Sequence, residues 1–152
     1  MPGVRPVFNQ VNIVSNDPEA SLDFYRRLGV SISDDEVWRT ATGIHHMNAS
    51  VPKASEPSRF EVDSAAFARI WNPAWRDHAD LGGRVVVGFG VSSRDDVDRL
   101  HAEMTGAGYR SLQAPHNAFW GARYAIIEDP DGIAVGLMSE MSDEYRSPPP
   151  EV

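Results

Sequence analysis

The 152-residue chain contains no cysteine, which excludes disulfide bonds, thiolate metal ligands and a cysteine nucleophile. It also lacks long apolar stretches: residues 85–91 form one of the longest, far short of the roughly 20 residues that span a bilayer. The first ten residues lack the apolar core of a signal peptide. We therefore expect a cytoplasmic protein with no membrane partner.

Basic residues are scarce, with 14 Lys and Arg against 22 Asp and Glu, a formal net charge of −8. This charge would repel the phosphates of nucleic acid and would mildly attract a cationic small molecule. The GxSxG, P-loop, dinucleotide-binding and HExxH motifs are also absent. With 41% hydrophobic and 24% charged residues, the composition is typical of a globular domain that buries a core.

Two segments of the chain, residues 8–30 and 85–109, resemble each other at a separation of about 77 residues. Each has an alternating strand, a polar capping stretch, an amphipathic helix and a glycine near its end. Asp17 and Pro18 suit the start of the first helix, and Gly29 suits its end. Ser93 and Asp96 resemble a capping box at the start of the second. This pattern predicts a duplicated module.

Short strand-like pieces follow each predicted helix. In the first half they are residues 30–33, 37–40, 45–51 and 59–62, and in the second half residues 109–113, 123–128 and 133–138. Residues 64–71 predict a short helix between the halves. The proline-rich end, residues 142–152, predicts a disordered tail.

These features resemble the vicinal oxygen chelate superfamily, which includes glyoxalases, extradiol dioxygenases and bleomycin-resistance proteins. The matching stretches are residues 14–29 (VSNDPEASLDFYRRLG), the repeat at residues 91–108, and residues 120–132 (WGARYAIIEDPDG). The resemblance implies an α+β fold in which paired βαβββ modules form an open, cupped mixed sheet. The single domain would span residues 1–141, with module one at 6–63, a linker at 64–83 and module two at 84–139.

The resemblance also implies where a metal would bind. Metal-dependent members place a His on the first strand, a His or Gln on the strand that opens the second module, and a Glu on the last. The corresponding residues here are Gln10, Val86 and Gly136. Glutamine can be a ligand, but Val86 and Gly136 offer no donor. We therefore expect no metal and no other cofactor at this site.

Other histidines and carboxylates give no clear ligand set. His45 and His46 are neighbours on a predicted strand, so their side chains point to opposite faces and cannot easily chelate one ion. One of them, taken as His45, could line the cup, although a structural histidine is the commoner case. Glu61 and Asp63 lie two apart on a strand, which is more typical of solvated charges than of a site.

The remaining candidate ligand-binding residues follow from strand alternation and aromatic content. Gln10 and Asn12 would face the cup, where a buried amide needs a hydrogen-bond partner. Val86, Gly88 and Gly136 would line its centre, unless the glycines mark a bulge or a close backbone approach. The other candidates are Trp38, Phe119, Trp120 and Arg123, of which Trp120 offers a planar stacking surface and Arg123 could equally form a surface ion pair.

Two functions fit these observations. The first is a metal-free protein that binds a planar, largely apolar small molecule, resembling sequestering proteins of the bleomycin-resistance type, and it would act in antibiotic resistance. The second is a glyoxalase-like lyase or isomerase, or a dioxygenase, with a non-standard metal site or a side-chain base. No residue pair at persuasive spacing identifies catalytic residues. The resemblance further implies a homodimer, in which each chain completes the other's cavities.

Overall fold

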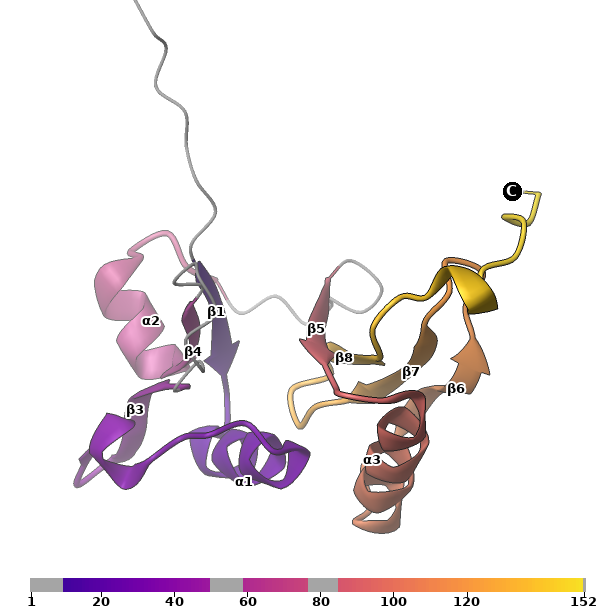
Figure 1. Ribbon diagram of the computed structural model, residues 1–152. Helices are drawn as coiled ribbons and strands as arrows, with labels where there is room; N and C mark the ends of the chain where they lie inside the picture. Colours follow the sequence, from indigo (N-terminus) through magenta and orange to yellow (C-terminus); the bar gives the residue numbers. More distant parts are fainter. Residues whose placement is uncertain (1–9, 50–58, 77–84, 152) are drawn as a thin grey trace, which may run out of the picture. The chain divides into compact units, whose positions relative to one another are not determined.

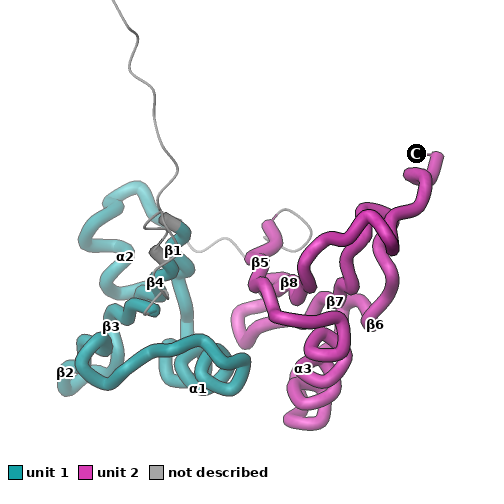
Figure 2. Tube along the Cα trace, viewed as in Figure 1, with its two compact units in different colours: residues 1–77 teal, residues 78–152 magenta. Residues whose placement is uncertain are grey.

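A computed structural model describes residues 10–49, 59–76 and 85–151 of the chain (Figure 1). The chain divides into two compact units, residues 1–77 (unit 1) and residues 78–152 (unit 2) (Figure 2). Each unit has its own four-stranded sheet. Within the described residues, no helix is long and apolar enough to cross a membrane.

Unit 1 contains the first strand–helix–strand module. Its elements are β1 (Gln10–Ser15), α1 (Pro18–Leu28), a 3-10 turn η1 (Asp34–Glu36), β2 (Val37–Thr40), β3 (Gly43–Asn48), β4 (Arg59–Ser64) and α2 (Ala65–Trp71). The strand order is β1-β4-β3-β2, in which β1 and β4 are parallel and the other pairs are antiparallel. The predicted strand at residues 30–33 does not form, and in this segment the Arg26 guanidinium donates to the carbonyl oxygen of Ile32.

Unit 2 repeats this topology. Its elements are β5 (Val86–Gly90), α3 (Arg94–Gly106), β6 (Ser111–Asn117), β7 (Arg123–Glu128), β8 (Ala134–Met138) and a 3-10 turn η2 (Asp143–Tyr145). The strand order β5-β8-β7-β6 matches that of unit 1, again with a parallel outer pair. The predicted duplication and the predicted α+β fold class are therefore confirmed.

The two long helices begin and end where the sequence predicts. The Asp17 carboxylate accepts a hydrogen bond from the Ala20 amide at the start of α1, and Gly29 ends the helix with a φ of 100°. At α3, the Ser93 hydroxyl accepts from the Asp96 amide at 3.1 Å. These caps satisfy backbone groups that the helix itself cannot pair.

Strand alternation gives the sheet of unit 1 an apolar face and a polar face. Ile13, Met47 and Val62 are buried and lie in register across β1, β4 and β3. They share the core with Leu22 and Tyr25 of α1. The residues that alternate with them therefore point to the opposite face, which carries the candidate site.

Residues 142–147, predicted to belong to the disordered tail, pair with the loop before β7. The Ser142 amide donates to the Gly121 carbonyl at 3.1 Å, and the Ser147 amide donates to the Phe119 carbonyl at 2.9 Å. The Arg94 guanidinium also lies over the Tyr145 ring, 3.9 Å from its centroid. The proline-rich composition at residues 148–150 did not reveal these contacts.

Candidate functional site

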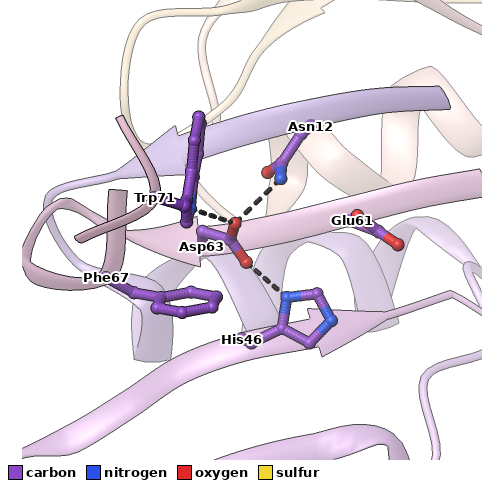
Figure 3. A pocket seen from close by; sticks show the side chains of 6 residues that line it. All are labelled: Asn12, His46, Glu61, Asp63, Phe67 and Trp71. Carbon is purple, nitrogen blue, oxygen red and sulfur yellow. Dashed lines mark hydrogen bonds and ion pairs between the residues drawn. The ribbon is translucent and has the colours of Figure 1, made fainter. Parts of the chain in front are cut away.

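A recess of about 380 Å³ lies on the polar face of unit 1 (Figure 3). Its lining combines two carboxylates, an amide, an imidazole and two aromatic rings: Asn12, His46, Glu61, Asp63, Phe67 and Trp71. The polar residues come from the three adjacent strands β1, β3 and β4, and the rings come from α2. This volume falls within the ~300–1,000 Å³ range of small-molecule sites.

Strand register brings the polar side chains together. Asn12 and Asn48 are both paired with Glu61, one on each side of β4. One step along, His46 is paired with Asp63. Directly paired residues of neighbouring strands project from the same face, so these side chains form two adjacent polar rows.

Asp63 is the centre of this arrangement. It is only 2% exposed, and its Oδ2 accepts hydrogen bonds from Asn12 Nδ2 at 2.8 Å and from Trp71 Nε1 at 3.0 Å. Its Oδ1 bonds with Nδ1 of His46. Figure 3 shows the three partners converging on this one carboxylate. Three donors compensate the cost of burying a charged group and fix its position.

The hydrogen bond to Asp63 also determines which nitrogen of the His46 ring carries the proton. A carboxylate only accepts, so Nδ1 of His46 donates and carries a proton. In the neutral ring, Nε2 is then an acceptor, and it has no hydrogen-bond partner among the described residues. The Phe67 ring lies edge-on to the imidazole at 6.0 Å between centroids. The site therefore presents a positioned acceptor beside an aromatic wall.

Two amide oxygens on this face have no partner within the described part of the chain. They are Oδ1 of Asn12 and Oδ1 of Asn48, and both atoms are buried. An unpaired buried acceptor costs about 1–3 kcal/mol, so a donor from outside these residues is expected to satisfy each one. Glu61, which is 7% exposed, lies between them in the strand register.

Some of the ligand-binding residues that the sequence predicts in unit 1 line the recess, and others do not. Asn12 lines the recess, and Trp38 of β2 packs edge-on against Phe67 at 5.2 Å. Gln10 lies in β1, but its side chain falls outside the described set. The recess is lined by His46 rather than His45.

His45 connects three hydroxyl-bearing residues. Its Nδ1 bonds with Ser64 Oγ at 2.8 Å, and its Nε2 bonds with the hydroxyls of Thr42 and Thr40. Ser64 also caps α2 by accepting from the Phe67 amide at 3.0 Å. His45 thus holds the start of the helix that supplies the aromatic wall, which is a structural role.

In unit 2, the predicted aromatic and basic residues are held by neighbours on the protein. Trp120 packs edge-on against Phe119 at 5.2 Å and against Tyr124 at 5.6 Å. Arg123 forms an ion pair with Asp98 at 2.9 Å and donates to the side-chain oxygen of Asn117 at 3.1 Å. Arg123 thus forms a surface ion pair, which was the alternative to a ligand-binding role for this residue.

Of the residues in unit 2 that the sequence predicts to line the centre of the cup, two have open space around them and one does not. Val86 is 48% exposed, and a Cβ placed on Gly88 would meet no atom within 4 Å. Gly136, paired with Gly88, is different: a Cβ there would lie 2.8 Å from the Tyr124 hydroxyl. The close approach of a tyrosine side chain accounts for this glycine, whereas the sequence alternative was a bulge or a close approach of backbone.

The three positions that the family resemblance assigns to metal ligands do not fit a metal. Val86 has no donor atom, and the Tyr124 ring occupies the space into which a side chain from residue 136 would extend. Among residues 10–49, 59–76 and 85–151, no group of three or more His, Asp or Glu side chains is placed to hold an ion. These positions therefore lack the donor atoms that a metal ion needs, and the Tyr124 ring leaves no room for a ligand side chain at residue 136.

Sequence reasoning missed most of the recess. Glu61 and Asp63 were interpreted as solvated charges, but both are buried, so that interpretation is wrong. A usable signal was present: the two acids flank the apolar Val62 on a strand that leads directly into a helix with aromatics at positions 67 and 71. The spacing of four residues places Phe67 and Trp71 on one helix face.

Known structures share this fold. A glyoxalase/bleomycin resistance protein/dioxygenase from Nocardioides is 21% identical with a TM-score of 0.67, over 99% of this chain and 91% of that one. A glyoxalase-related enzyme from Fulvimarina pelagi is 16% identical with a TM-score of 0.69, over 90% and 89% of the two chains. A lactoylglutathione lyase from Agrobacterium tumefaciens is 16% identical with a TM-score of 0.62, over 89% and 94%.

At these identities the structural likeness shows the fold alone. No curated protein sequence matches the chain significantly. The family model for the Glyoxalase/Bleomycin resistance protein/Dioxygenase superfamily matches residues 7–137, most of the chain. With its two repeated strand–helix modules, this chain therefore belongs to the glyoxalase/bleomycin resistance protein/dioxygenase superfamily.

Proposed function

We propose that this chain binds a planar organic molecule in the recess of unit 1 and sequesters it, in the manner of bleomycin-resistance-type proteins. The observation that carries the proposal is Trp71: its Nε1 is fixed by the buried Asp63, while 47% of the residue stays exposed. An indole held in place with an open surface is a ready stacking platform, because little side-chain entropy remains to be lost on binding.

Phe67 extends this platform. Its ring contacts Trp38 and His46 edge-on, and both Phe67 and Trp71 border the polar rows. A ligand with a flat apolar body and a polar edge would match the two parts of the recess. Small-molecule sites commonly combine apolar walls with a few placed polar groups.

Fluorescence titration with a library of planar aromatic compounds tests the proposal. A bound compound should quench Trp71, so Trp71→Phe should remove most of the quenching. Trp71→Ala should weaken binding about tenfold, since ring stacking contributes about 0.5–1.5 kcal/mol beyond area burial. Trp120→Ala is the matched control in unit 2, and its affinity should be unchanged.

The opposite pattern would contradict this placement. If Trp120→Ala weakens binding and Trp71→Ala does not, the ligand binds at Trp120, as the sequence alone suggested. Absence of any binding compound in the library would contradict the sequestering function itself.

A second candidate function is catalysis by a side-chain base. His46 favours it, because Asp63 fixes its ring and leaves Nε2 as an acceptor at the recess. Such a pair can accept a proton from a bound substrate. The lactoylglutathione lyase that shares the fold suggests a first substrate to test, the adduct of methylglyoxal with glutathione.

The assay is run with a chelator present, so that only protein side chains are available for proton transfer. Formation of lactoylglutathione that is lost in His46→Gln would favour this second candidate. No turnover above the rate of the His46→Gln variant is the result expected for a sequestering protein.

A further inference from the structure

We propose that the ligand of this recess carries a neutral N–H donor at the edge of a flat heteroaromatic body, and that this donor binds Nε2 of His46. This inference rests on the proposed binding function and names the class of molecule that the recess takes. The imidazole lines the recess from β3, together with the rings of Phe67 and Trp71 from α2 (Figure 3).

The carboxylates of the recess are already engaged within the protein. Asn12 Nδ2 and Trp71 Nε1 both donate to Oδ2 of Asp63, and Nδ1 of His46 bonds with its Oδ1. Glu61, the other carboxylate of the lining, also has an interaction partner. Neither acid therefore requires a cation from the ligand, and we expect the ligand to be neutral.

Nε2 of His46 is an acceptor that remains open at the recess. The ring donates through Nδ1, so the neutral imidazole carries a lone pair on Nε2. No residue of the described part of the chain donates to that atom, and 26% of the His46 side chain is exposed. Figure 3 shows this second ring nitrogen on the side of the imidazole turned away from Asp63. A donor that enters the recess can therefore reach it.

An amide oxygen of the lining points to the same ligand chemistry. Oδ1 of Asn12 is buried and has no partner within the described residues. Its identity is fixed, because the amide nitrogen must be the atom that donates to the Asp63 carboxylate. Both this oxygen and Nε2 of His46 are acceptors. A molecule that offers only acceptors, such as an ether, gains no hydrogen bond from either atom.

The shape of the recess places the donor at the edge of the ligand. A ring nitrogen accepts along its lone pair, in the plane of the imidazole. The N–H group of a heteroaromatic ring lies in the plane of that ring, so it can bind Nε2 and leave both faces of the molecule for aromatic contact. Phe67, whose ring lies 6.0 Å from the imidazole at 78° to it, and the half-exposed Trp71 provide that contact.

Binding should also strengthen the hydrogen bond behind the imidazole. A donor on Nε2 and the Nδ1–H group that bonds with Asp63 form one continuous chain through the ring of His46. Hydrogen bonds in such a chain polarise one another. We therefore expect both ring nitrogens to respond when a donor binds, whereas a ligand that only stacks leaves this chain unchanged.

The test compares two flat, neutral probes of almost equal outline on the full-length chain: indole, and benzofuran, in which a ring oxygen replaces the N–H group. NMR titration of protein that contains isotope-labelled histidine follows affinity and the His46 resonances together. Indole should bind about two- to tenfold more tightly, the ratio expected for one neutral hydrogen bond. It should shift the Nε2 and Nδ1–H resonances of His46, and benzofuran should leave both nearly unchanged.

Two matched variants then locate the effect. His46→Phe keeps a ring and removes the acceptor, so the affinities for the two probes should become equal. His101→Phe makes the same change in α3 of unit 2 and should retain the preference for indole. Since His46→Phe also removes a donor from the buried Asp63, far-UV circular dichroism checks that each variant keeps its fold. The titrations of the unmodified protein do not depend on that outcome.

Different failures have different meanings. Equal affinities for the two probes and an unshifted Nε2 resonance, with both probes weakened by Trp71→Ala, would overturn the donor inference and leave the proposed binding function standing. A preference for indole that persists in His46→Phe would overturn the assignment to His46. If neither probe binds while compounds of the planar library still quench Trp71, the donor inference fails alone. Absence of binding by every compound would contradict the binding function itself.

Discussion

The phenol oxygen of Tyr124 lies 2.8 Å from the point that a Cβ on Gly136 would occupy. Two ring carbons of the same tyrosine lie within 3.3 Å of that point. The Tyr124 ring is itself flanked by Trp120, at 5.6 Å between centroids, and by His116, at 6.0 Å. A glycine on β8 and a tyrosine on β7 therefore fit together as one packed unit.

This packing predicts the effect of a single methyl group. Gly136→Ala should lower the free energy of unfolding by about 1–3 kcal/mol, because an overpacked site must shift neighbours to fit the added atom. In a Tyr124→Leu background the same change should cost much less. Urea denaturation of the four proteins of this cycle measures the coupling.

Gly88 provides the matched control, since it is paired with Gly136 and a Cβ there meets nothing within 4 Å. Gly88→Ala should leave stability unchanged or raise it slightly, because alanine has less conformational freedom to lose on folding. Equal destabilisation by the two alanines would show that strand geometry, rather than the tyrosine, is responsible.

Asp63 should contribute to stability as well as to the site. Asp63→Asn replaces an acceptor of three hydrogen bonds with a group whose nitrogen cannot accept, so we expect a loss of about 1–3 kcal/mol in the free energy of unfolding. Asp35→Asn, at an exposed position of η1, should stay within about 0.5 kcal/mol of the parent protein. Chemical denaturation at pH 7 checks both, and similar values for the two variants would argue against the hydrogen-bonded role.

Stability should depend on pH through His101 of α3. Burial lowers the pKa of this imidazole, and the nearby Asp98 carboxylate raises it by less. A lowered pKa means that the folded protein favours the neutral ring. The associated stability is therefore fully present above the ordinary value of about 6.5 and is lost as the pH falls through the lowered value.

The comparison of parent protein with His101→Gln isolates this contribution from the other histidines. As the pH is lowered from about 7.5 to about 5, the free energy of unfolding should fall more in the parent protein than in His101→Gln. If the free energy of unfolding instead falls less in the parent than in the variant on acidification, the attraction of Asp98 outweighs burial in setting the pKa of His101.

The purified protein is expected to carry no stoichiometric transition metal. Val86 and Gly136 cannot supply donors at two of the three positions that the family resemblance assigns to ligands. Elemental analysis of protein purified without chelators is the measurement. About one zinc, nickel or iron per chain, lost on substitution of Gln10, would contradict the prediction.

We also expect a homodimer of this 16.8 kDa chain. A two-fold contact between identical chains is the commonest form of assembly, and paired chains of this fold complete each other's cavities by the family resemblance. Sedimentation velocity at micromolar concentration should show a species of twice the chain mass. A single species of chain mass at all concentrations would rule the dimer out.

Several elements could be predicted from local sequence because their causes are local. Asp17, Pro18 and Gly29 define the ends of α1, and Ser93 begins α3, since capping depends on a few neighbouring residues. The repeated strand–helix pattern was sufficient to predict the duplicated fold. Residues 30–33 show the limit of local patterns: they alternate like a strand but pair with none, and the Ile32 carbonyl oxygen accepts from the Arg26 side chain instead.

The composition of the recess, in contrast, was decided by tertiary structure. Alternation alone predicts that His45 and His46 face opposite ways, but not which one faces Asp63, because that depends on the pairing of β3 with β4. Asp63 lies 17 residues from His46 and 51 from Asn12 along the chain. Only the alignment of three strands brings these groups to one face, and only that burial turns two ordinary strand carboxylates into a candidate binding site.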